Sequence, residues 1–250
     1  MNELLSNKAS SLTVLYNQQE MRMIQLMKQI IQKTPLYNPL SKWLAKRRYQ
    51  IQFEEWKRNG RPVPPPHIVK QRTLQLYSKK YGLKVLVETG TYYGAMVEAM
   101  KDVFDHIYSI EISKELYELA RERFKTVKHI ELINGDSGVE LKNVIDKLEI
   151  DARPALFWLD GHYSGGVTSR GNKDTPINEE LSHILGGSDR GHVIIIDDAR
   201  LFGTDPAYPN MEELKAFIKS KRVDVDIVVQ DDSIRIVPKG KLSKNGFESM

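Results

Sequence analysis

The most regular pattern in the chain is a series of short apolar runs separated by longer stretches with helical periodicity. The first run, 85–87, is continuously aliphatic and β-branched, which is typical of a strand buried on both faces. Apolar residues then recur at helical spacing, at Met96, Val97, Met100, Val103 and Phe104. Further apolar runs predict strands at 106–110, 129–133, 155–159 and 193–196. Strands that alternate with helices in this way predict an α/β fold, a parallel sheet with helices on both faces.

Between the second and third strands, the pattern predicts a helix that begins after the N-cap residue Ser113 and buries one apolar stripe. That stripe contains Leu116, Leu119, Ala120 and Phe124. A short helix is expected after the third strand. Two last strands, at 224–229 and 233–237, are expected to form an antiparallel hairpin around a turn at Asp231 and Asp232.

The clearest breakpoint in the chain is the proline-rich segment 59–66, NGRPVPPP. Proline lacks a backbone donor and fixes φ, so four prolines within five positions exclude regular helix and stiffen the connection. We therefore expect three parts: a basic helical extension with its linker over 1–66, the α/β domain over 67–240 and a loose tail over 241–250.

The N-terminal part of the chain is strongly basic. Residues 1–80 contain 15 Lys and Arg against 4 Asp and Glu, whereas residues 81–250 contain 22 against 29. Apolar periodicity predicts helices at about 12–31 and 40–57, and another at 68–81. Basic amphipathic helices that contain methionine are compatible with peripheral membrane binding, with homo-oligomer contact and with a plain solvated face.

The composition excludes several classes of site. The chain has no cysteine, so disulfides, thiolate zinc sites and cysteine nucleophiles are absent, and a metal must bind oxygen or imidazole ligands. We find no apolar run of about eighteen residues and no signal-peptide pattern, so we expect a cytoplasmic protein, with the membrane periphery as an alternative. Neither the G-x-S-x-G nucleophile pattern nor a P-loop is present.

Five successive predicted strands end in a carboxylate. These residues are Glu88, Glu111, Asp136, Asp160 and Asp197. Because the carboxyl ends of parallel strands lie along one edge of a sheet, this pattern concentrates negative charge around a single crevice. Mutual repulsion there is destabilising unless cations or hydroxyl groups compensate for it. The pattern therefore predicts a ligand site.

The turn after the first strand, E-T-G-T-Y-Y-G, carries Gly90 and Gly94, which let a backbone pass close to a ligand. A tyrosine stands where a dinucleotide-binding turn needs its second glycine for the pyrophosphate. This argues against NAD and FAD and favours an adenosyl ligand without phosphates. Glu111, at the end of the second strand, lies about where the acid of such folds reaches the ribose hydroxyls.

With this turn, these acidic strand ends and the terminal hairpin, residues 68–238 resemble the class I S-adenosylmethionine-dependent methyltransferases. More narrowly, the turn is similar to the E-x-G-x-x-x-G motif of cation-dependent O-methyltransferases, the group that includes catechol and macrolide-sugar enzymes. The resemblance implies a Rossmann-like, doubly wound, mostly parallel seven-stranded sheet. The stretch L-D-G-H-Y-S-G-G followed by D-T-P resembles proteins of sugar and surface-polysaccharide biosynthesis, which implies a sugar or glycan acceptor.

The resemblance also implies which residues bind S-adenosylmethionine. They are Glu88, Thr89, Gly90, Thr91, Tyr92, Gly94, Glu111, Ile112, Asp136 and Ser137. Within this set, Glu111 would hold the ribose, and Asp136 with Ser137 would hold the adenine edge. The alternative for Asp136 and Ser137 is a plain helix N-cap.

Asp160, Asp197 and Asp198 match the positions that hold magnesium in that group, with manganese as the alternative ion. A bound cation would lower the pKa of an acceptor hydroxyl, and Asp160 with His162 forms the expected catalytic pair. His162, unperturbed at a pKa of about 6.5, would accept the proton, although the sugar enzymes carry an acidic residue there. Its alternative is an ordinary loop residue, and Asp197 with Asp198 could instead cap the segment at Ala199.

Three other functions compete with this interpretation. The same fold could transfer a methyl group to a nitrogen or a carboxylate without a metal. The basic extension could bind nucleic acid, but it lacks interleaved aromatic and basic residues on a recognisable motif, so we do not expect nucleic acid as a partner. A scaffold that binds the cofactor without turnover is the least favoured, because the acidic residues and His162 are all present.

Overall fold

The computed structural model describes residues 37–160 and 175–240. The helix predicted at about 12–31, His162 and the tail 241–250 lie outside the described residues. The chain divides into two compact units, Met1–Glu55 and Trp56–Met250. The described part of the first unit belongs to α2 (Tyr37–Arg58), which confirms the helix predicted at 40–57.

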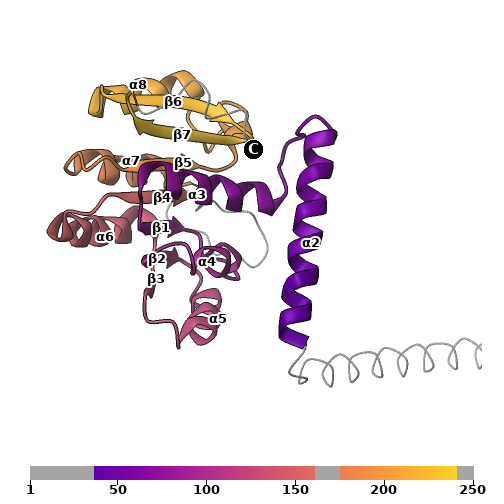
Figure 1. Cartoon of the computed structure of the whole chain (residues 1–250). Coiled ribbons are helices and arrows are strands. Elements are labelled where there is room, and N and C mark those ends of the chain that lie inside the picture. The colour runs from indigo at the N-terminus through magenta and orange to yellow at the C-terminus, as the bar shows by residue number, and fades with distance from the viewer. Residues whose placement is uncertain (1–36, 161–174, 241–250) are drawn as a thin grey trace, which may run out of the picture. The chain divides into compact units, whose positions relative to one another are not determined.

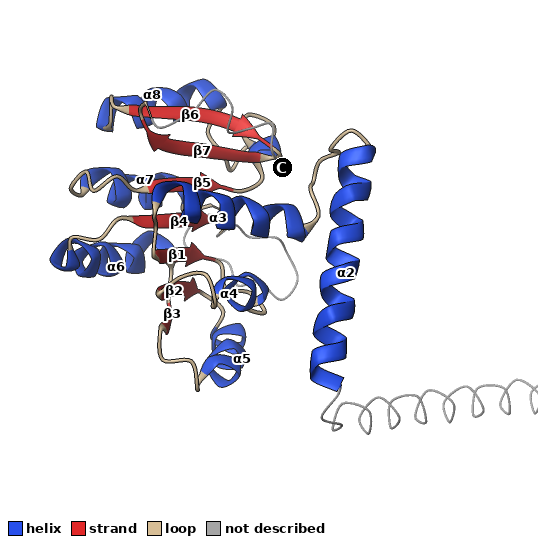
Figure 2. Cartoon of the chain, viewed as in Figure 1, coloured by secondary structure: helices blue, strands red, loops and turns tan. Residues whose placement is uncertain are grey.

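The second unit is built on one seven-stranded sheet with the order β3-β2-β1-β4-β5-β7-β6 (Figure 2). The strands are β1 (Val85–Thr89), β2 (His106–Glu111), β3 (Ile130–Asn134), β4 (Ala155–Leu159), β5 (Val193–Ile196), β6 (Val225–Gln230) and β7 (Ser233–Pro238). The first five are parallel, and β7 pairs antiparallel with both β5 and β6. The predicted Rossmann-like, doubly wound sheet with its C-terminal hairpin is therefore confirmed.

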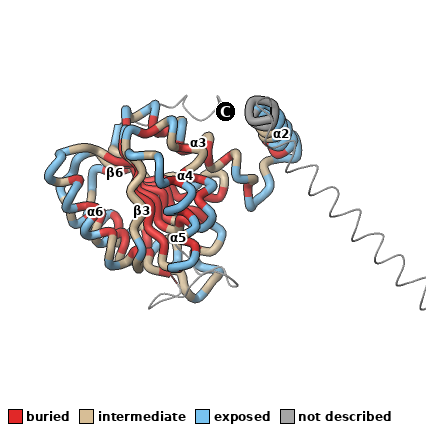
Figure 3. Tube along the Cα trace, turned by 90° about the horizontal axis from the view of Figure 1, so that it is seen from below, coloured by how far each residue is buried: buried red, intermediate tan, exposed pale blue. Residues whose placement is uncertain are grey.

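Helices cover both faces of this sheet (Figure 1). One layer holds α3 (His67–Tyr81), α4 (Ala95–Met100) and α5 (Lys114–Phe124), and the other holds α6 (Ser137–Asp151), α7 (Ile177–Gly186) and α8 (Met211–Lys221). Side chains of the central strands point alternately to the two faces of the sheet and so contribute to two separate cores. Leu86 and Trp158 belong to the core beneath α3, α4 and α5, whereas Val87 and Phe157 belong to the core beneath α6, α7 and α8. Figure 3 shows the buried strands between the two layers. Because both faces of these strands are buried, their sequences are continuous apolar runs.

The structure corrects two details of the helix predictions. The helix after β3 is not short, because α6 continues for 15 residues and buries Leu141, Val144 and Leu148 against the sheet. In α5, Ser113 is the N-cap as predicted, and Leu116, Ala120 and Phe124 are buried. Leu119 was wrongly placed on this stripe: it is 58% exposed, since its position on the helix turns it away from the sheet.

No helix in the two described ranges is both long enough and apolar enough to cross a membrane.

Candidate active site

The turn after β1 is held against β2 by backbone hydrogen bonds. The amides of Gly90 and Thr91 both donate to the carbonyl oxygen of Ile110, over 2.9 and 3.2 Å. Gly90 and Gly94 have left-handed backbones, with φ of 87° and 72°, which glycine adopts without a steric penalty. Since α4 begins directly after Gly94, the turn lies at the carboxyl edge of the sheet, where such folds bind ligands.

Gly94 also occupies a place in which a side chain does not fit. A Cβ atom on Gly94 would lie 2.7 Å from Cε2 of the Phe124 ring. Gly82, which follows α3, has a similar left-handed φ of 67° but nothing within 4 Å of its Cβ position. The two glycines therefore share a backbone conformation and differ in packing.

We expect Gly94→Ala to lower the free energy of unfolding by about 1–3 kcal/mol more than Gly82→Ala. Both substitutions strain a left-handed backbone, but only the first also presses a methyl group into the ring of Phe124. Denaturant unfolding of the two variants measures the difference. Equal losses would contradict the expectation and show that the ring moves aside at little cost.

Glu111 ties the turn to the end of β2. Its carboxylate accepts hydrogen bonds from the backbone amides of Tyr92 (2.7 Å) and Ser113 (2.9 Å). Its carbonyl oxygen accepts a hydrogen bond from the side-chain amide of Asn134, at the end of β3. Glu111 is only 5% exposed, so its position and orientation are fixed by the surrounding backbone. Ile112, the next residue, is partly exposed.

Glu88 lies beneath the same turn and is 1% exposed. It accepts a hydrogen bond from the hydroxyl of Ser109 over 2.5 Å, and that hydroxyl lies 2.6 Å from the hydroxyl of Thr91. Burial raises the pKa of Glu88 to about 8, although the hydrogen bond from Ser109 favours the charged form. Near neutral pH, Glu88 is therefore largely a neutral acid unless a cation approaches it.

Asp136 and Ser137 begin α6. Oδ1 of Asp136 accepts a hydrogen bond from the amide of Gly138 over 2.9 Å, so Asp136 is the N-cap of the helix. The structure thus confirms for Asp136 the alternative role predicted above, that of a helix N-cap. A contact of Asp136 or Ser137 with the adenine edge stays a prediction.

The carboxylates of Asp160, Asp197 and Asp198 form a cluster at the ends of β4 and β5. One carboxylate oxygen from each lies within 4.8 Å of the others. Oδ1 of Asp197 is buried and has no hydrogen-bond partner among the residues that the structure describes. Burial, and then the neighbouring charge of Asp197, raises the pKa of Asp160 well above its usual range. Adjacent parallel strands have therefore brought the three predicted carboxylates together.

Sequence reasoning missed the cation that lies in this cluster. The ammonium group of Lys70, on α3, donates a hydrogen bond to Oδ2 of Asp197 and lies 3.9 Å from Oδ1 of Asp198. Burial alone would lower the pKa of Lys70, but the charges of Asp197 and Asp160 outweigh this effect and raise it. No local motif marks Lys70, because 127 positions separate it from Asp197.

A second cation lies at the edge of the cluster. The guanidinium of Arg200 is 2.7 Å from Oδ1 of Asp198 and also pairs with Asp232. Asp198 has a left-handed backbone, with φ of 55°, and precedes the short helix η1 (Ala199–Leu201). Its side chain makes no capping bond, so the capping alternative predicted for Asp198 is not what the structure shows. A left-handed backbone at a residue other than glycine is common at functional sites.

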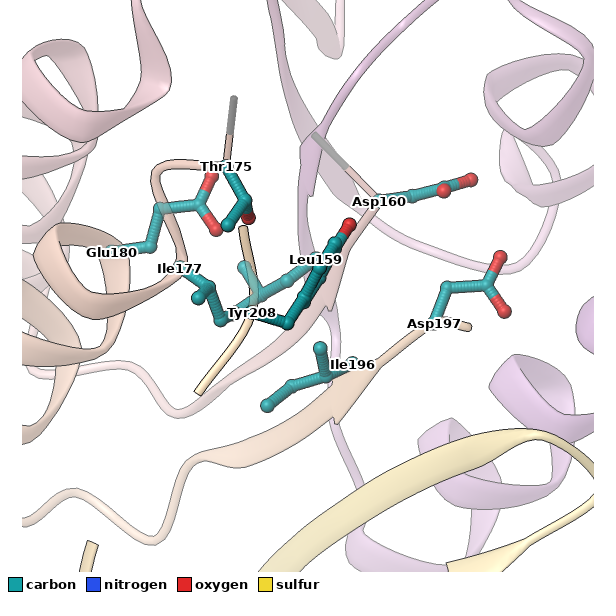
Figure 4. Close-up of a pocket in the computed structure, with 8 residues that line it drawn as sticks. All are labelled: Leu159, Asp160, Thr175, Ile177, Glu180, Ile196, Asp197 and Tyr208. Carbon is teal, nitrogen blue, oxygen red and sulfur yellow. The ribbon is translucent and has the colours of Figure 1, made fainter. Parts of the chain in front are cut away.

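A pocket lies beside the cluster. Its walls are formed by Leu159, Asp160, Thr175, Ile177, Glu180, Ile196, Asp197 and Tyr208. Figure 4 shows that Asp160 and Asp197 point to one side of the strand ends, whereas Glu180 lies on the opposite side with Thr175. The predicted residue His162 and the glycines at 165 and 166 belong to the segment 161–174, outside the described residues.

Comparison with known proteins gave matches among solved structures only. No protein-family model matches the chain, and no curated protein matches it significantly. The O-methyltransferase TomG of Streptomyces achromogenes, in complex with S-adenosylmethionine, is 18% identical with a TM-score of 0.49, covering 77% of this chain and 89% of TomG. An O-methyltransferase of Bacillus cereus, in complex with S-adenosylhomocysteine, is 14% identical with a TM-score of 0.48, covering 76% and 90%.

A third similar structure is the S-adenosylhomocysteine-bound methyltransferase PaMTH1 of Podospora anserina, at 18% identity and a TM-score of 0.45 over 83% of this chain and 97% of that one. With identities and TM-scores this low, a function for this chain has to be argued from the residues of its own site.

Proposed function

We propose that this chain is an S-adenosylmethionine-dependent O-methyltransferase that methylates a hydroxyl group of a sugar or glycan intermediate with the help of a divalent cation. The observation that carries the proposal is the cluster of Asp160, Asp197 and Asp198 beside the turn that follows β1. One edge of the sheet thus offers a cradle for an adenosyl ligand and, next to it, oxygen ligands for a metal.

The cradle suits an adenosyl cofactor without phosphates. The turn carries two left-handed glycines, and the Glu111 carboxylate is fixed at its border by two backbone amides. A carboxylate held in this way can accept hydrogen bonds from the two hydroxyls of a ribose. Glu88 adds a buried carboxyl group beneath the turn, and a cationic ligand above it would favour its charged form.

The residues of the cluster also fit a divalent cation. Asp160, Asp197 and Asp198 supply three carboxylates, which are hard oxygen ligands of the kind that Mg²⁺ and Mn²⁺ prefer. Oδ1 of Asp197 is buried with no hydrogen-bond partner among the described residues, so one ligand oxygen is available without breaking a bond. The other oxygen of Asp197 pairs with Lys70, and a metal that used it would displace that ammonium group.

The main task of the site in this reaction is to align the acceptor oxygen with the methyl group. Methyl transfer from a sulfonium is an in-line displacement, so the acceptor oxygen has to be held in line with the methyl group and deprotonated. A cation at the cluster would lower the pKa of an acceptor hydroxyl. The three carboxylates would orient that cation, and we expect His162 to accept the proton.

Lys70 supports a second candidate, methyl transfer without a metal. Its ammonium group already neutralises part of the cluster and sits between Asp197 and Asp198. In that case the carboxylates and Lys70 would hold the acceptor directly. The two candidates differ in whether a chelator abolishes the reaction.

The test is transfer of a labelled methyl group from S-adenosylmethionine to a panel of neutral methyl glycosides, with Mg²⁺ and with a chelator. The proposal predicts transfer that falls by about a hundredfold or more on chelation, because the cation would stabilise the deprotonated acceptor oxygen by several kcal/mol. Transfer that survives chelation would favour the metal-free candidate. Cofactor binding with no transfer to any hydroxyl acceptor would contradict the O-methyltransferase assignment.

A further inference from the structure

The turn of the C-terminal hairpin lies beside the acidic cluster. β7 pairs antiparallel with β5, with Ile234 opposite Ile196, so the turn that precedes β7 lies at the edge of the sheet where β5 ends. Asp231 and Asp232 form this turn, and both have left-handed backbones, with φ of 50° and 61°. Asp198 lies two residues after Ile196. The hairpin turn is therefore a neighbour of one of the predicted metal ligands.

Asp232 contacts the segment after Asp198 in three ways. Its carbonyl oxygen accepts a hydrogen bond from the amide of Ala199 over 2.8 Å. Its Oδ1 atom accepts a hydrogen bond from the amide of Arg200 over 3.0 Å, and its Oδ2 atom accepts one from the Arg200 guanidinium. The Asp232 side chain is 1% exposed. Asp232 thus holds both the backbone that follows Asp198 and the side chain of Arg200.

One nitrogen of Arg200 contacts two carboxylates. Its Nη1 atom donates a hydrogen bond to Oδ1 of Asp198 over 2.7 Å and another to Oδ2 of Asp232. Both carboxylates are buried, whereas the Arg200 side chain is partly exposed. A guanidinium that is shared in this way attracts each carboxylate less strongly than it would attract one alone. Asp232 therefore competes with Asp198 for the same cation.

A divalent ion at the cluster would need the negative charge of Asp198. Oδ1 of Asp198 lies 3.9 Å from the ammonium group of Lys70 and 2.7 Å from Arg200. Each of these cations opposes the binding of a metal ion to the same carboxylate. A second carboxylate on Arg200 reduces one of the two opposing charges. Groups that contact the neighbours of a metal ligand commonly tune the affinity for the metal in this way.

We propose that Asp232 is a positioning residue of the metal site, which neutralises the Arg200 guanidinium and so leaves the Asp198 carboxylate available to a divalent cation. This inference rests on the proposed function, because it assigns the acidic cluster to Mg²⁺ or Mn²⁺. Asp232 acts through Arg200 and is not itself a ligand of the metal. The C-terminal hairpin would thus contribute to the site in addition to completing the sheet.

Asp232→Asn is the main test variant. Asparagine has nearly the size of aspartate, tolerates a left-handed backbone and can still accept a hydrogen bond from the amide of Arg200, so the main change is the loss of charge. Asp231→Asn is the matched control. Asp231 is the other left-handed aspartate of the turn, and it pairs with Arg61 and Arg235. The two variants remove the same charge from adjacent positions.

The affinity for Mg²⁺ is measured by calorimetry with S-adenosylhomocysteine bound, and thermal unfolding shows whether each variant folds. We expect Asp232→Asn to weaken Mg²⁺ binding about tenfold, because an Arg200 guanidinium without its second partner pairs more strongly with Asp198. Asp231→Asn should stay within about twofold of wild type. In an Arg200→Met background, Asp232→Asn should change the affinity less than about twofold, because the cation through which it acts is gone.

Three results would overturn the inference. Equal losses of Mg²⁺ affinity in Asp232→Asn and Asp231→Asn would mean that only the net charge of the turn matters. An equal loss from Asp232→Asn with and without Arg200 would show that Asp232 does not act through Arg200. Weaker Mg²⁺ binding by Arg200→Met than by wild type would show that Arg200 supports Asp198 as a ligand and does not compete for it. This last result decides the question even if Asp232→Asn does not fold.

The same titrations separate this inference from the proposed function. Unchanged Mg²⁺ affinity in Asp232→Asn, with normal binding by wild type, would overturn the role of Asp232 and leave the metal site standing. Wild type that binds S-adenosylhomocysteine but gives no Mg²⁺ signal would overturn the metal site together with this inference, and would favour methyl transfer without a metal.

Discussion

Asp197→Asn is expected to abolish the calorimetric signal of Mg²⁺ binding and to lower methyl transfer by about a hundredfold or more. Asp197 is 4% exposed, with one oxygen bound to Lys70 and the other without a partner among the described residues. An amide in its place keeps the shape but loses the charge that attracts a divalent ion. The Mg²⁺ titration is performed with S-adenosylhomocysteine bound, so that the proposed cofactor site next to the cluster is occupied.

Lys70→Met is expected to have the opposite effect on Mg²⁺ binding. It alters the same ion pair but removes the cation in place of the anion, so Asp197 loses its partner and Asp198 loses one of two nearby cations. We expect this variant to bind Mg²⁺ at least tenfold more tightly than wild type, which corresponds to about 1.4 kcal/mol. Arg200→Met, which removes the other cation beside Asp198, should have a smaller effect because it pairs at the border of the cluster. Unchanged Mg²⁺ binding in both Asp197→Asn and Lys70→Met would contradict a metal site at this cluster.

Glu88→Gln is expected to stabilise the protein at alkaline pH and to leave its stability at acid pH nearly unchanged. The pKa of Glu88 is about 8 in the folded protein, against 4.5 for the ordinary group. Between these two values the unfolded chain has lost the proton and the folded chain retains it. The stability of wild type therefore falls as the pH rises from about 4.5 to about 8, by a total on the order of 5 kcal/mol from this one group. Glutamine has no proton to lose, so the variant lacks this slope.

Denaturant unfolding at pH 5 and pH 9 measures the effect of Glu88→Gln. Glu122→Gln serves as the control because Glu122 is a well-exposed glutamate on α5. The difference between Glu88→Gln and wild type should grow from near zero at pH 5 to several kcal/mol at pH 9, while the control stays parallel to wild type. Parallel profiles for all three proteins would show that the Glu88 carboxyl group is not buried as the structure has it.

Much of the sheet could be predicted from the sequence because its strands are buried on both faces. β4 and β5 begin and end where the apolar runs 155–159 and 193–196 do. The acidic cluster could be predicted for a related reason. Asp160 and Asp197 directly follow adjacent parallel strands, and the geometry of such a sheet brings their side chains to the same edge.

The residues that were missed depend on contacts between distant parts of the chain. Lys70 looks like any solvated lysine of a basic helix, and only the packing of α3 on the sheet brings it to Asp197. Glu180 follows another glutamate at the start of α7, where an acidic residue is normally an exposed partner of the helix dipole. It is buried because the packing of α7 places it beside Thr89 of β1 and Ser137 of α6.

The most direct test of the central claim is calorimetric titration of the full chain with S-adenosylmethionine, repeated with Glu111→Ala. The Glu111 carboxylate is fixed by the amides of Tyr92 and Ser113 at the border of the turn, so its loss should remove the ribose contact and also release the turn from the end of β2. We predict binding at micromolar Kd for wild type and an affinity at least about tenfold lower for the variant. No binding of S-adenosylmethionine by wild type up to about 1 mM would contradict the methyltransferase assignment.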